Sequence, residues 1–408
     1  MAPGLWLRLT ALAAAAGVAA TVATGEWTRS HEATVLGTLA LILAVTASVW
    51  FGHRDRKALL VASFLALGLF LVEIAIGAIT ASVGSGSWAS GLHVAFGSLS
   101  LAASVVTVAL TLRGAPSERP ARSSWRDYVT LTKPRIMVLL LLTAVAGAFV
   151  GAEGVPSLGL LLTLLGGLAL ACGGASALNH VLDRDIDVYM KRTDRRPVAT
   201  GRISPERGLE FGLALSAFSF VVLASFANVL TALLAVFGNL FYVVVYTRYL
   251  KRSTAQNIVI GGAAGAVPAV VGWSAVTGNL GLPALLLFLI VFYWTPPHFW
   301  ALALLIRGDY EAAKVPMLPI VKGDRETARS ITRYTVLMVA ITLLPFAVGG
   351  LSYLYLGAAV ALGALFLWYA VALQRETTRA RAKTLFTYSL SYLALLSVAM
   401  AVDPIILS

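Results

Sequence analysis

Long apolar runs alternate with short polar segments along the chain, and this pattern predicts a bundle of membrane-spanning helices. An α-helix needs roughly 20 apolar residues to cross a bilayer, and most runs have about that length. The predicted fold is an all-α polytopic membrane protein, with a four-helix N-terminal bundle followed by nine further helices. The expected spans lie near residues 7–25, 32–52, 58–82 and 91–112, then 136–153, 156–180, 207–226, 228–248, 257–275, 281–306, 331–351, 353–373 and 386–405.

A polar segment separates the two sets of helices and marks a domain boundary. It reads GAPSERPARSSWR and is rich in Pro, Ser and Arg, as linkers are. We therefore expect a bundle over residues 1–113, a linker over 114–126 and a second domain over 127–408. The apolar run after Arg8 also resembles a secretory signal peptide, so cleavage within residues 1–24 is an alternative. We favour retention, because it keeps an even four-helix unit.

Composition agrees with the helix pattern and excludes several classes of protein. Hydrophobic residues make up 59% of the chain and charged residues only 12%, whereas soluble proteins carry about 25% charged residues. A soluble enzyme is thereby excluded, and a single cysteine excludes a disulfide framework. The 31 Lys and Arg against 19 Asp and Glu give a net charge of +12. In a membrane protein such an excess marks cytoplasmic loops, so we expect no nucleic-acid partner.

Basic residues are concentrated in alternate loops, which tests the helix count independently. Under the positive-inside rule this alternation places the N-terminus inside and the C-terminus outside, as thirteen spans require. We expect an integral, multi-pass protein of a prokaryotic cell membrane, surrounded by lipid.

The densest polar cluster follows the sixth expected span. Asn179, Asp183 and Asp187 recur at i, i+4 and i+8, so on a helix their oxygens line one face. Carboxylates at that spacing repel each other unless a cation lies between them. Mg²⁺ takes oxygen ligands and is commonly completed by substrate phosphates. The cluster therefore predicts a Mg²⁺ site for a diphosphate, with an ordinary charged loop as the alternative.

Four basic residues stand just beyond this cluster. They suit the remaining charge of a diphosphate, and arginine can offer it bidentate contacts. The four are Lys191, Arg192, Arg195 and Arg196.

Two further polar groups fall on the same side by the charge count. Pro296 and Pro297 precede His298, and we expect the prolines to break the tenth span and turn His298 towards a cavity. A structural histidine bonded to a neighbouring helix is the alternative. Asp309 follows at the end of that span. The third group, residues 246–257, opens a glycine-rich span whose small residues permit close helix packing.

These polar strings carry a family resemblance. Residues from about 127 to 405 resemble the UbiA superfamily of intramembrane prenyltransferases, and within it the branch that acts on heme. The strings that carry the resemblance are Leu131-Thr132-Lys133-Pro134-Arg135, Asn179-His180 with Asp183 and Asp185-Ile186-Asp187, Arg195-Arg196-Pro197, Tyr246-Thr247 with Leu250-Lys251-Arg252, and Pro296-Pro297-His298-Phe299-Trp300.

The resemblance implies a Mg²⁺-dependent transfer of a farnesyl group from farnesyl diphosphate to the 2-vinyl group of protoheme IX (heme b), giving heme O and diphosphate. It implies that Asn179, Asp183 and Asp187 hold the metal and take part in catalysis, with His298 as a candidate base or heme contact. The candidate substrate contacts are Lys191, Arg192, Arg195, Arg196, Lys251, Arg252, Asn257 and Asp309.

The superfamily's second aspartate-rich motif is replaced here by His298 and Asp309, which leaves the ligands of a second metal open. Heme A synthase or terminal-oxidase assembly factors are the partners that the resemblance implies. Two rival functions remain open, a heme transporter or chaperone and a prenyltransferase with a quinone-type acceptor.

The first four helices show a weaker resemblance of their own. Residues 72–80 with Gly91-Leu92-His93 look like part of the heme A synthase family, which is built from two four-helix halves that carry histidine pairs. The segment looks like one half, with His31 and His93 as candidate axial ligands of a heme b iron. A vestigial structural bundle is the alternative.

Overall fold

The computed structural model describes residues 5–24, 29–53, 56–83, 88–111 and 123–407. Over these residues the chain is helical and contains no strand. Within the same residues, thirteen helices are long and apolar enough to cross a membrane, which confirms the expected number.

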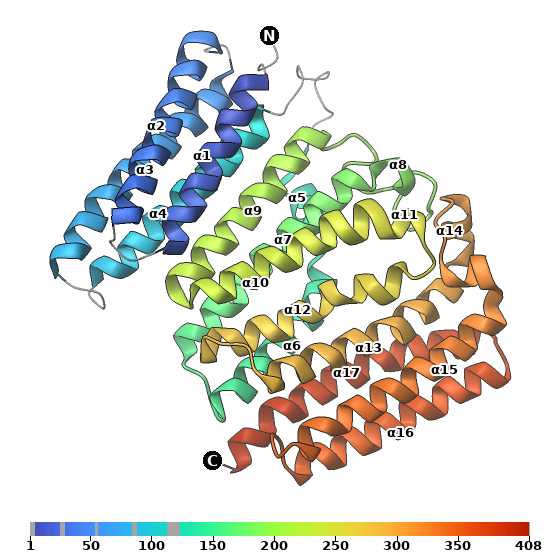
Figure 1. Ribbon diagram of the computed structural model, residues 1–408. Helices are drawn as coiled ribbons and strands as arrows, with labels where there is room; N and C mark the ends of the chain where they lie inside the picture. The colour runs from blue at the N-terminus through green and yellow to red at the C-terminus, as the bar shows by residue number, and fades with distance from the viewer. Residues whose placement is uncertain (1–4, 25–28, 54–55, 84–87, 112–122, 408) are drawn as a thin grey trace.

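Four antiparallel helices form the N-terminal bundle (Figure 1). A continuous apolar core holds them together, with Val18, Val49 and Phe70 fully buried. Its helices are α1 (Leu5–Thr24), α2 (Arg29–Gly52), α3 (Lys57–Val83) and α4 (Trp88–Thr111).

The remaining helices form the second domain. Its long elements are α6 (Pro134–Ala152), α7 (Leu158–Leu182), α9 (Pro205–Phe226), α10 (Val229–Leu240), α12 (Asn257–Thr277), α13 (Leu282–Leu305), α15 (Leu318–Ala347), α16 (Tyr353–Arg375) and α17 (Arg379–Leu407). Its short elements are α5 (Trp125–Thr132), α8 (Arg184–Asp187), η1 (Phe241–Leu250), α11 (Lys251–Ser253) and α14 (Arg307–Ala312).

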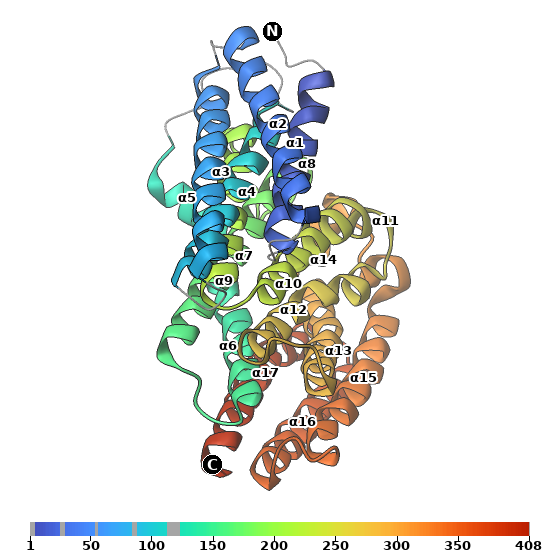
Figure 2. The same ribbon diagram turned by 60° about the vertical axis from the view of Figure 1, so that its left-hand side comes forward.

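The bundle packs on the second domain through α4 and α9, which lie side by side in both ribbon views (Figures 1 and 2). Val94 and Leu101 of α4 reach the apolar cluster that Leu164 and Phe220 form in the second domain. Most of the predicted linker lies outside the described residues, and its last two positions, Trp125 and Arg126, begin α5.

Small residues bring α6 and α12 into backbone contact. A Cβ atom at Gly272 would lie 1.8 Å from the carbonyl oxygen of Ala144, and one at Gly147 would lie 2.2 Å from that of Ala269. Gly262, nearer the start of α12, packs against Thr295 of α13, whereas a Cβ atom at Gly265 would meet no described atom within 4 Å. The predicted packing role of the glycine-rich string is therefore confirmed for Gly262 and not for Gly265.

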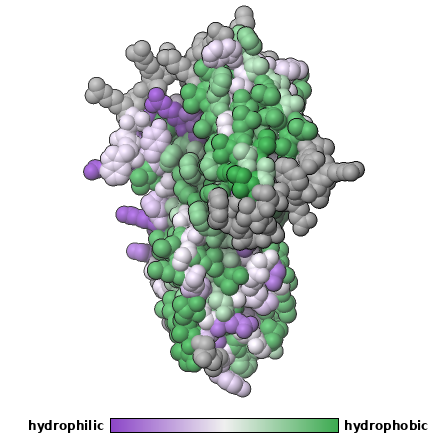
Figure 3. Space-filling model, turned by 90° about the vertical axis from the view of Figure 1, so that its left-hand side faces the viewer, coloured by the Kyte–Doolittle hydropathy of each residue, from purple (hydrophilic) through white to green (hydrophobic). Residues whose placement is uncertain are grey.

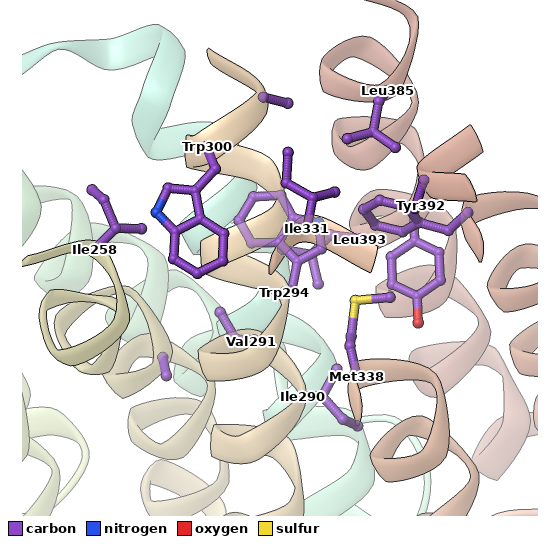
Figure 4. Packing of buried hydrophobic residues seen from close by; sticks show 14 of the residues in the cluster. Ile258, Ile290, Val291, Trp294, Trp300, Ile331, Met338, Leu385, Tyr392 and Leu393 are labelled. Atoms are coloured by element: carbon purple, nitrogen blue, oxygen red, sulfur yellow. The ribbon is translucent and has the colours of Figure 1, made fainter. Parts of the chain in front are cut away.

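The prediction that Pro296 and Pro297 interrupt the tenth span is wrong, because α13 runs unbroken through both prolines. Membrane helices tolerate proline where neighbouring helices and Ser or Thr side chains stabilise the freed backbone. The carbonyl groups that lose their helical donors here are those of Phe292 and Tyr293, four residues before the two prolines. Figure 4 shows Trp294 and Trp300 of this segment enclosed by apolar side chains of neighbouring helices.

The outer surface suits a lipid environment. Large apolar side chains such as Leu36, Phe51, Leu162 and Trp368 are exposed. Hydrophobic residues spread over the broad face that Figure 3 shows, and hydrophilic residues are confined to smaller patches. The short helices α8, α11 and α14 gather at one end of the molecule, where the polar strings of the sequence meet (Figure 1).

Candidate active site

The C-terminal end of α7 carries the first two residues of the aspartate cluster. The Asn179 amide donates to Asp183 Oδ2 at 2.8 Å, as the i, i+4 spacing predicts, and to Thr247 Oγ1 at 3.1 Å. All three side chains are buried. The end of α7 and the π-helix η1 are thus joined through a single amide group.

Lys133 is a site residue that the sequence analysis missed. Its Nζ donates to Asn179 Oδ1 at 2.7 Å. Burial, together with the cations Arg196 and Lys251, holds the pKa of Lys133 well below its usual range. The lysine connects α5 to α6 with φ 50° and ψ 56°, a left-handed conformation that is costly for a residue with a side chain. Lys133 stands in the Leu131–Arg135 string that carries the family resemblance, but no role was assigned to it from the sequence.

Two carboxylates of the cluster are paired with cations from other elements. Lys251 Nζ lies 2.5 Å from Asp183 Oδ2, and Arg252 Nη2 lies 3.8 Å from Asp183 Oδ1. Arg196 Nη1 donates to both oxygens of Asp187, at 2.9 and 2.8 Å. Burial raises the pKa of Asp187, and Arg196 opposes that rise. The structure therefore brings the expected carboxylates and three of the expected cations together.

The rim of the site is formed by more exposed groups. Arg252 holds Asp185 with bonds of 2.6 and 2.7 Å and lowers the pKa of that carboxyl. The backbone N–H of Arg192 donates to Asp309 Oδ2 at 3.2 Å, which ties the loop after α8 to α14. Tyr310, next to Asp309, is buried, and burial raises its pKa. Two of the three predicted polar groups thus meet at this contact.

The third predicted group reaches the site through a π-helix. Residues 241–250 form η1, and this segment places Thr247 beside Asn179 and delivers Lys251 and Arg252 to the carboxylates. π-helical turns are rare and often occur at functional sites. Apolar periodicity alone does not distinguish such a segment from an α-helix, so no pattern in the sequence indicated it.

The remaining predicted contacts differ in their surroundings. Asn257, at the start of α12, is fully buried, and neither atom of its amide has a hydrogen-bond partner among the described residues. Lys191 and Arg195 are exposed, and the Arg195 carbonyl accepts from Arg202 at 2.9 Å. Asn257 is therefore available to a ligand, whereas roles for Lys191 and Arg195 stay predictions.

His298 lies in an aromatic stack between α13 and α17. Its ring stacks on Trp294 at 4.4 Å and on Phe386 at 4.8 Å, and Nδ1 lies 2.7 Å from Ser389 Oγ. These contacts fit the alternative of a structural histidine. A catalytic role for His298 stays a prediction.

The donor set fits Mg²⁺ bound together with a diphosphate. In the part of the chain that the structure describes, no group of three or more His, Cys, Asp or Glu side chains forms a ready metal site. Mg²⁺ is often held by one or two carboxylates, with waters and substrate phosphates completing its shell. Asp183 Oδ1 is buried and has no hydrogen-bond partner among the described atoms, so it can take such a role.

In the N-terminal bundle, one of the two predicted histidines is described. His93 Nδ1 lies 3.3 Å from the Glu73 carbonyl oxygen and 3.6 Å from Glu73 Oε1. Glu73 is buried in α3. The His31 side chain lies outside the described residues, so the pairing of the two histidines stays a prediction.

Comparison with known proteins defines the class. The UbiA prenyltransferase family matches residues 140–396. Solved structures share the fold: a digeranylgeranylglyceryl phosphate synthase aligns with a TM-score of 0.58 at 20% identity, over 69% of this chain and 98% of that one. A UbiA homolog from Archaeoglobus fulgidus bound to GPP and Mg²⁺ aligns with a TM-score of 0.50 at 16% identity, over 68% of this chain and 99% of that one. The chain belongs to the UbiA prenyltransferase family.

Curated relatives narrow the class further. A protoheme IX farnesyltransferase from Roseiflexus sp. (strain RS-1) is 44% identical over 92% of this chain and 75% of its own length. Another from Gloeobacter violaceus is 53% identical over 69% of this chain and 92% of its own. The chain is an enzyme of this group of prenyltransferases.

Proposed function

We propose that the protein transfers the farnesyl group of farnesyl diphosphate to the 2-vinyl group of protoheme IX, with Mg²⁺ and the uptake of one water molecule, to give heme O and diphosphate. The observation that carries the proposal is the convergence of Lys133, Lys251 and Arg196 on Asn179, Asp183 and Asp187. The names of the curated relatives support the acceptor, and the homolog bound to GPP and Mg²⁺ supports the donor and the metal.

The same residues account for departure of the diphosphate. Bound Mg²⁺, held by Asp183, Asp187 and Asn179, would neutralise charge on the leaving group. Lys251 adds positive charge where negative charge develops, and Lys133 adds a second once it is protonated beside the bound diphosphate. Both side chains are already positioned by their bonds to Asn179 and Asp183, so little reorganisation is needed. Asn179 orients both Asp183 and Lys133, because its amide bonds to each. The C–O bond can then break towards an allylic cation.

The apolar interior protects that cation. Trp294 and Trp300 lie in the buried cluster that extends from the site between α12, α13 and α15 (Figure 4). Excluding bulk water prevents premature hydrolysis of a reactive intermediate. Among the described residues, Trp300 Nε1 and the Asn257 amide are buried without hydrogen-bond partners, and both are candidates to contact the substrates.

The test is product analysis with the full chain. Purified protein is incubated with protoheme, farnesyl diphosphate and Mg²⁺, and the extracted pigment is weighed by mass spectrometry. We expect a heme that gains a hydroxyethylfarnesyl group, and a loss of at least about 100-fold in Asp183→Ala. The matched control is Asp194→Ala, an exposed carboxylate in the loop after α8. Unchanged protoheme in every sample, despite tight binding, would favour a heme carrier. Prenylation of a quinone in preference to heme would favour the other rival.

A second proposal concerns the N-terminal bundle, which we infer to bind heme b through His31 and His93. Metal-bound histidines usually hold their other ring nitrogen against a carboxylate or carbonyl, and the contact of His93 Nδ1 with Glu73 is of this kind. Heme titration followed by visible absorption should show weaker uptake in His31→Ala and His93→Ala. His53→Ala, at the other end of α2, is the control. Unchanged spectra in both variants would contradict heme binding and favour the alternative of a purely structural bundle.

The basic loops favour the positive-inside orientation, with the N-terminus and the active site on the cytoplasmic side. A heme A synthase or a terminal-oxidase assembly factor is the proposed recipient of the product, as the resemblance implies.

A further inference from the structure

Two buried polar side chains on α7 make none of the contacts of the diphosphate site. His180 is 1% exposed and Ser176 is 6% exposed. Neither ring nitrogen of His180, nor Ser176 Oγ, has a hydrogen-bond partner within the described residues. Buried polar groups in proteins are nearly always hydrogen-bonded, because an unpaired one is costly. Two such groups one helical turn apart therefore point to a bound partner.

The position of the pair on α7 connects it to the diphosphate site. Ser176, Asn179, His180 and Asp183 follow the spacing i, i+3, i+4 and i+7, so they share one face of the helix. The bonds of Asn179 to Lys133 and Thr247, and of Asp183 to Lys251, show that this face is turned towards the diphosphate site. His180 directly follows Asn179, and Ser176 lies one turn deeper in the membrane span.

The surroundings of the ring also belong to the diphosphate site. The charged groups that act on His180 are Lys133, Arg196 and Lys251, the cations that we place around the diphosphate. On α7 the pair lies on the membrane-interior side of Asn179 and Asp183, and we place the prenyl C–O bond that breaks beside it.

The hydrogen-bonding groups of Ser176 and His180 favour a small neutral molecule as their bound partner. A hydroxyl and a neutral imidazole each offer both a donor and an acceptor. Side chains at i, i+4 have Cβ atoms about 5–6 Å apart, which two hydrogen bonds of about 2.8 Å through one water can bridge. A diphosphate oxygen only accepts, so it would leave the acceptors of the pair unused. A metal-bound histidine normally has a carboxylate or carbonyl on its other nitrogen, and no described residue supplies one to His180.

We propose that Ser176 and His180 hold the water molecule that the prenyl transfer consumes. The inference rests on the proposed function, whose product carries a hydroxyl group. The C–O bond of farnesyl diphosphate breaks, and its electron pair leaves with the diphosphate. The π pair of the vinyl group forms the new C–C bond to the farnesyl carbon and leaves a cation on the vinyl carbon nearer the ring. A lone pair of the held water forms the C–O bond there, and the water's proton goes to the departed diphosphate.

The test is the ratio of two products. Without a positioned water, the cation loses a neighbouring proton and gives an alkene lighter than the alcohol by one water. We expect Ser176→Ala and His180→Phe to shift prenylated heme from the alcohol to this alkene by at least tenfold. Ser176→Thr and His180→Gln, which keep hydrogen-bonding groups, should restore the alcohol. The control is Ser225→Ala, which removes another unpartnered buried hydroxyl, close to the far end of α9.

The other possible outcomes would contradict the proposal that Ser176 and His180 hold a water molecule. Alcohol alone from both variants, at the wild-type ratio, would overturn the inference. A raised KM for farnesyl diphosphate with an unchanged product ratio would assign the pair to the diphosphate instead. If the wild-type protein makes no prenylated heme, the proposed function fails and this inference fails with it. Thermal unfolding of each variant separates a folding defect from a change of product.

Discussion

Asn179 shows how the chemistry of this site depends on single hydrogen bonds. Its amide accepts from Lys133 and donates to Asp183 and Thr247, so three segments far apart in the sequence meet at one side chain. The contact between Asn179 and Asp183 was predictable from their i, i+4 spacing in the sequence, because both lie at the end of one helix. The positions of Lys133 and Thr247 depend on how α6 and η1 pack against α7, which no local pattern specifies.

Lys133 makes binding of a diphosphate sensitive to pH. Its pKa lies well below the usual range in the free protein, and a bound anion stabilises the protonated form. At pH values above that lowered pKa, binding of Mg²⁺ and pyrophosphate should therefore take up protons through Lys133, and affinity should fall as pH rises through that range. Calorimetry in two buffers of different ionisation enthalpy measures the uptake. Lys133→Met should show less uptake than wild type, and equal uptake in both proteins would contradict the prediction.

His298 can be tested as a structural residue by a variant that keeps its stack. His298→Phe retains an aromatic ring against Trp294 and Phe386 but loses the contact with Ser389. We expect a loss of about 1 kcal/mol in the free energy of unfolding and a turnover rate within tenfold of wild type. A turnover rate lowered by about two orders of magnitude, without loss of stability, would instead support the predicted base.

At the scale of helices, the closest contact is between α6 and α12. Gly272→Ala places a methyl group against the Ala144 carbonyl, an atom that cannot move without shifting α6. We expect a loss of about 1–3 kcal/mol in stability, measured by thermal unfolding in detergent. Gly265→Ala on the same helix is the matched control, because its Cβ would have no described atom within 4 Å. Equal unfolding temperatures for the two variants would refute this packing.

The start of α16 depends on a carboxylate from another helix. Asp403 of α17 accepts from the backbone N–H groups of Ser352 and Tyr355, at 2.8 and 2.9 Å, and from the Ser352 hydroxyl at 2.5 Å. Asp403→Ala leaves these donors unpaired, and we expect it to cost about 1–3 kcal/mol in stability. Asp403→Asn keeps one acceptor oxygen and should lose less. The ranking of the two unfolding temperatures checks the prediction.

The helices of this fold were predictable from the sequence to different degrees. All thirteen spans followed from apolar length alone, since a bilayer imposes that length on every helix. The continuity of α13 through Pro296 and Pro297 and the π-helix η1 did not follow. Both depend on how these segments pack against neighbouring helices, which the local sequence does not specify.

At the scale of the whole molecule, the two predicted ligand sites lie at opposite ends. His93 is near the start of α4, whereas the carboxylates lie with α8 and α11 at the other end of the molecule (Figure 1). The sites should therefore act independently. We expect Asp183→Ala to leave heme uptake by the bundle unchanged, and His93→Ala to leave the rate of farnesyl transfer within about twofold of wild type. Loss of both activities in either variant would show that the sites are coupled.

The left-handed turn at Lys133 joins a surface helix to a membrane span. The lysine ends α5, whose Trp125 is 71% exposed, and it also begins the span α6. One residue thus joins a surface helix to a membrane span and also holds an amino group against Asn179. A change in the tilt of the span α6, as a thinner or thicker bilayer would impose, would therefore move that amino group relative to Asn179. Bilayer thickness should then affect the geometry of the catalytic centre. Reconstitution in lipids of different chain length should change the rate of farnesyl transfer.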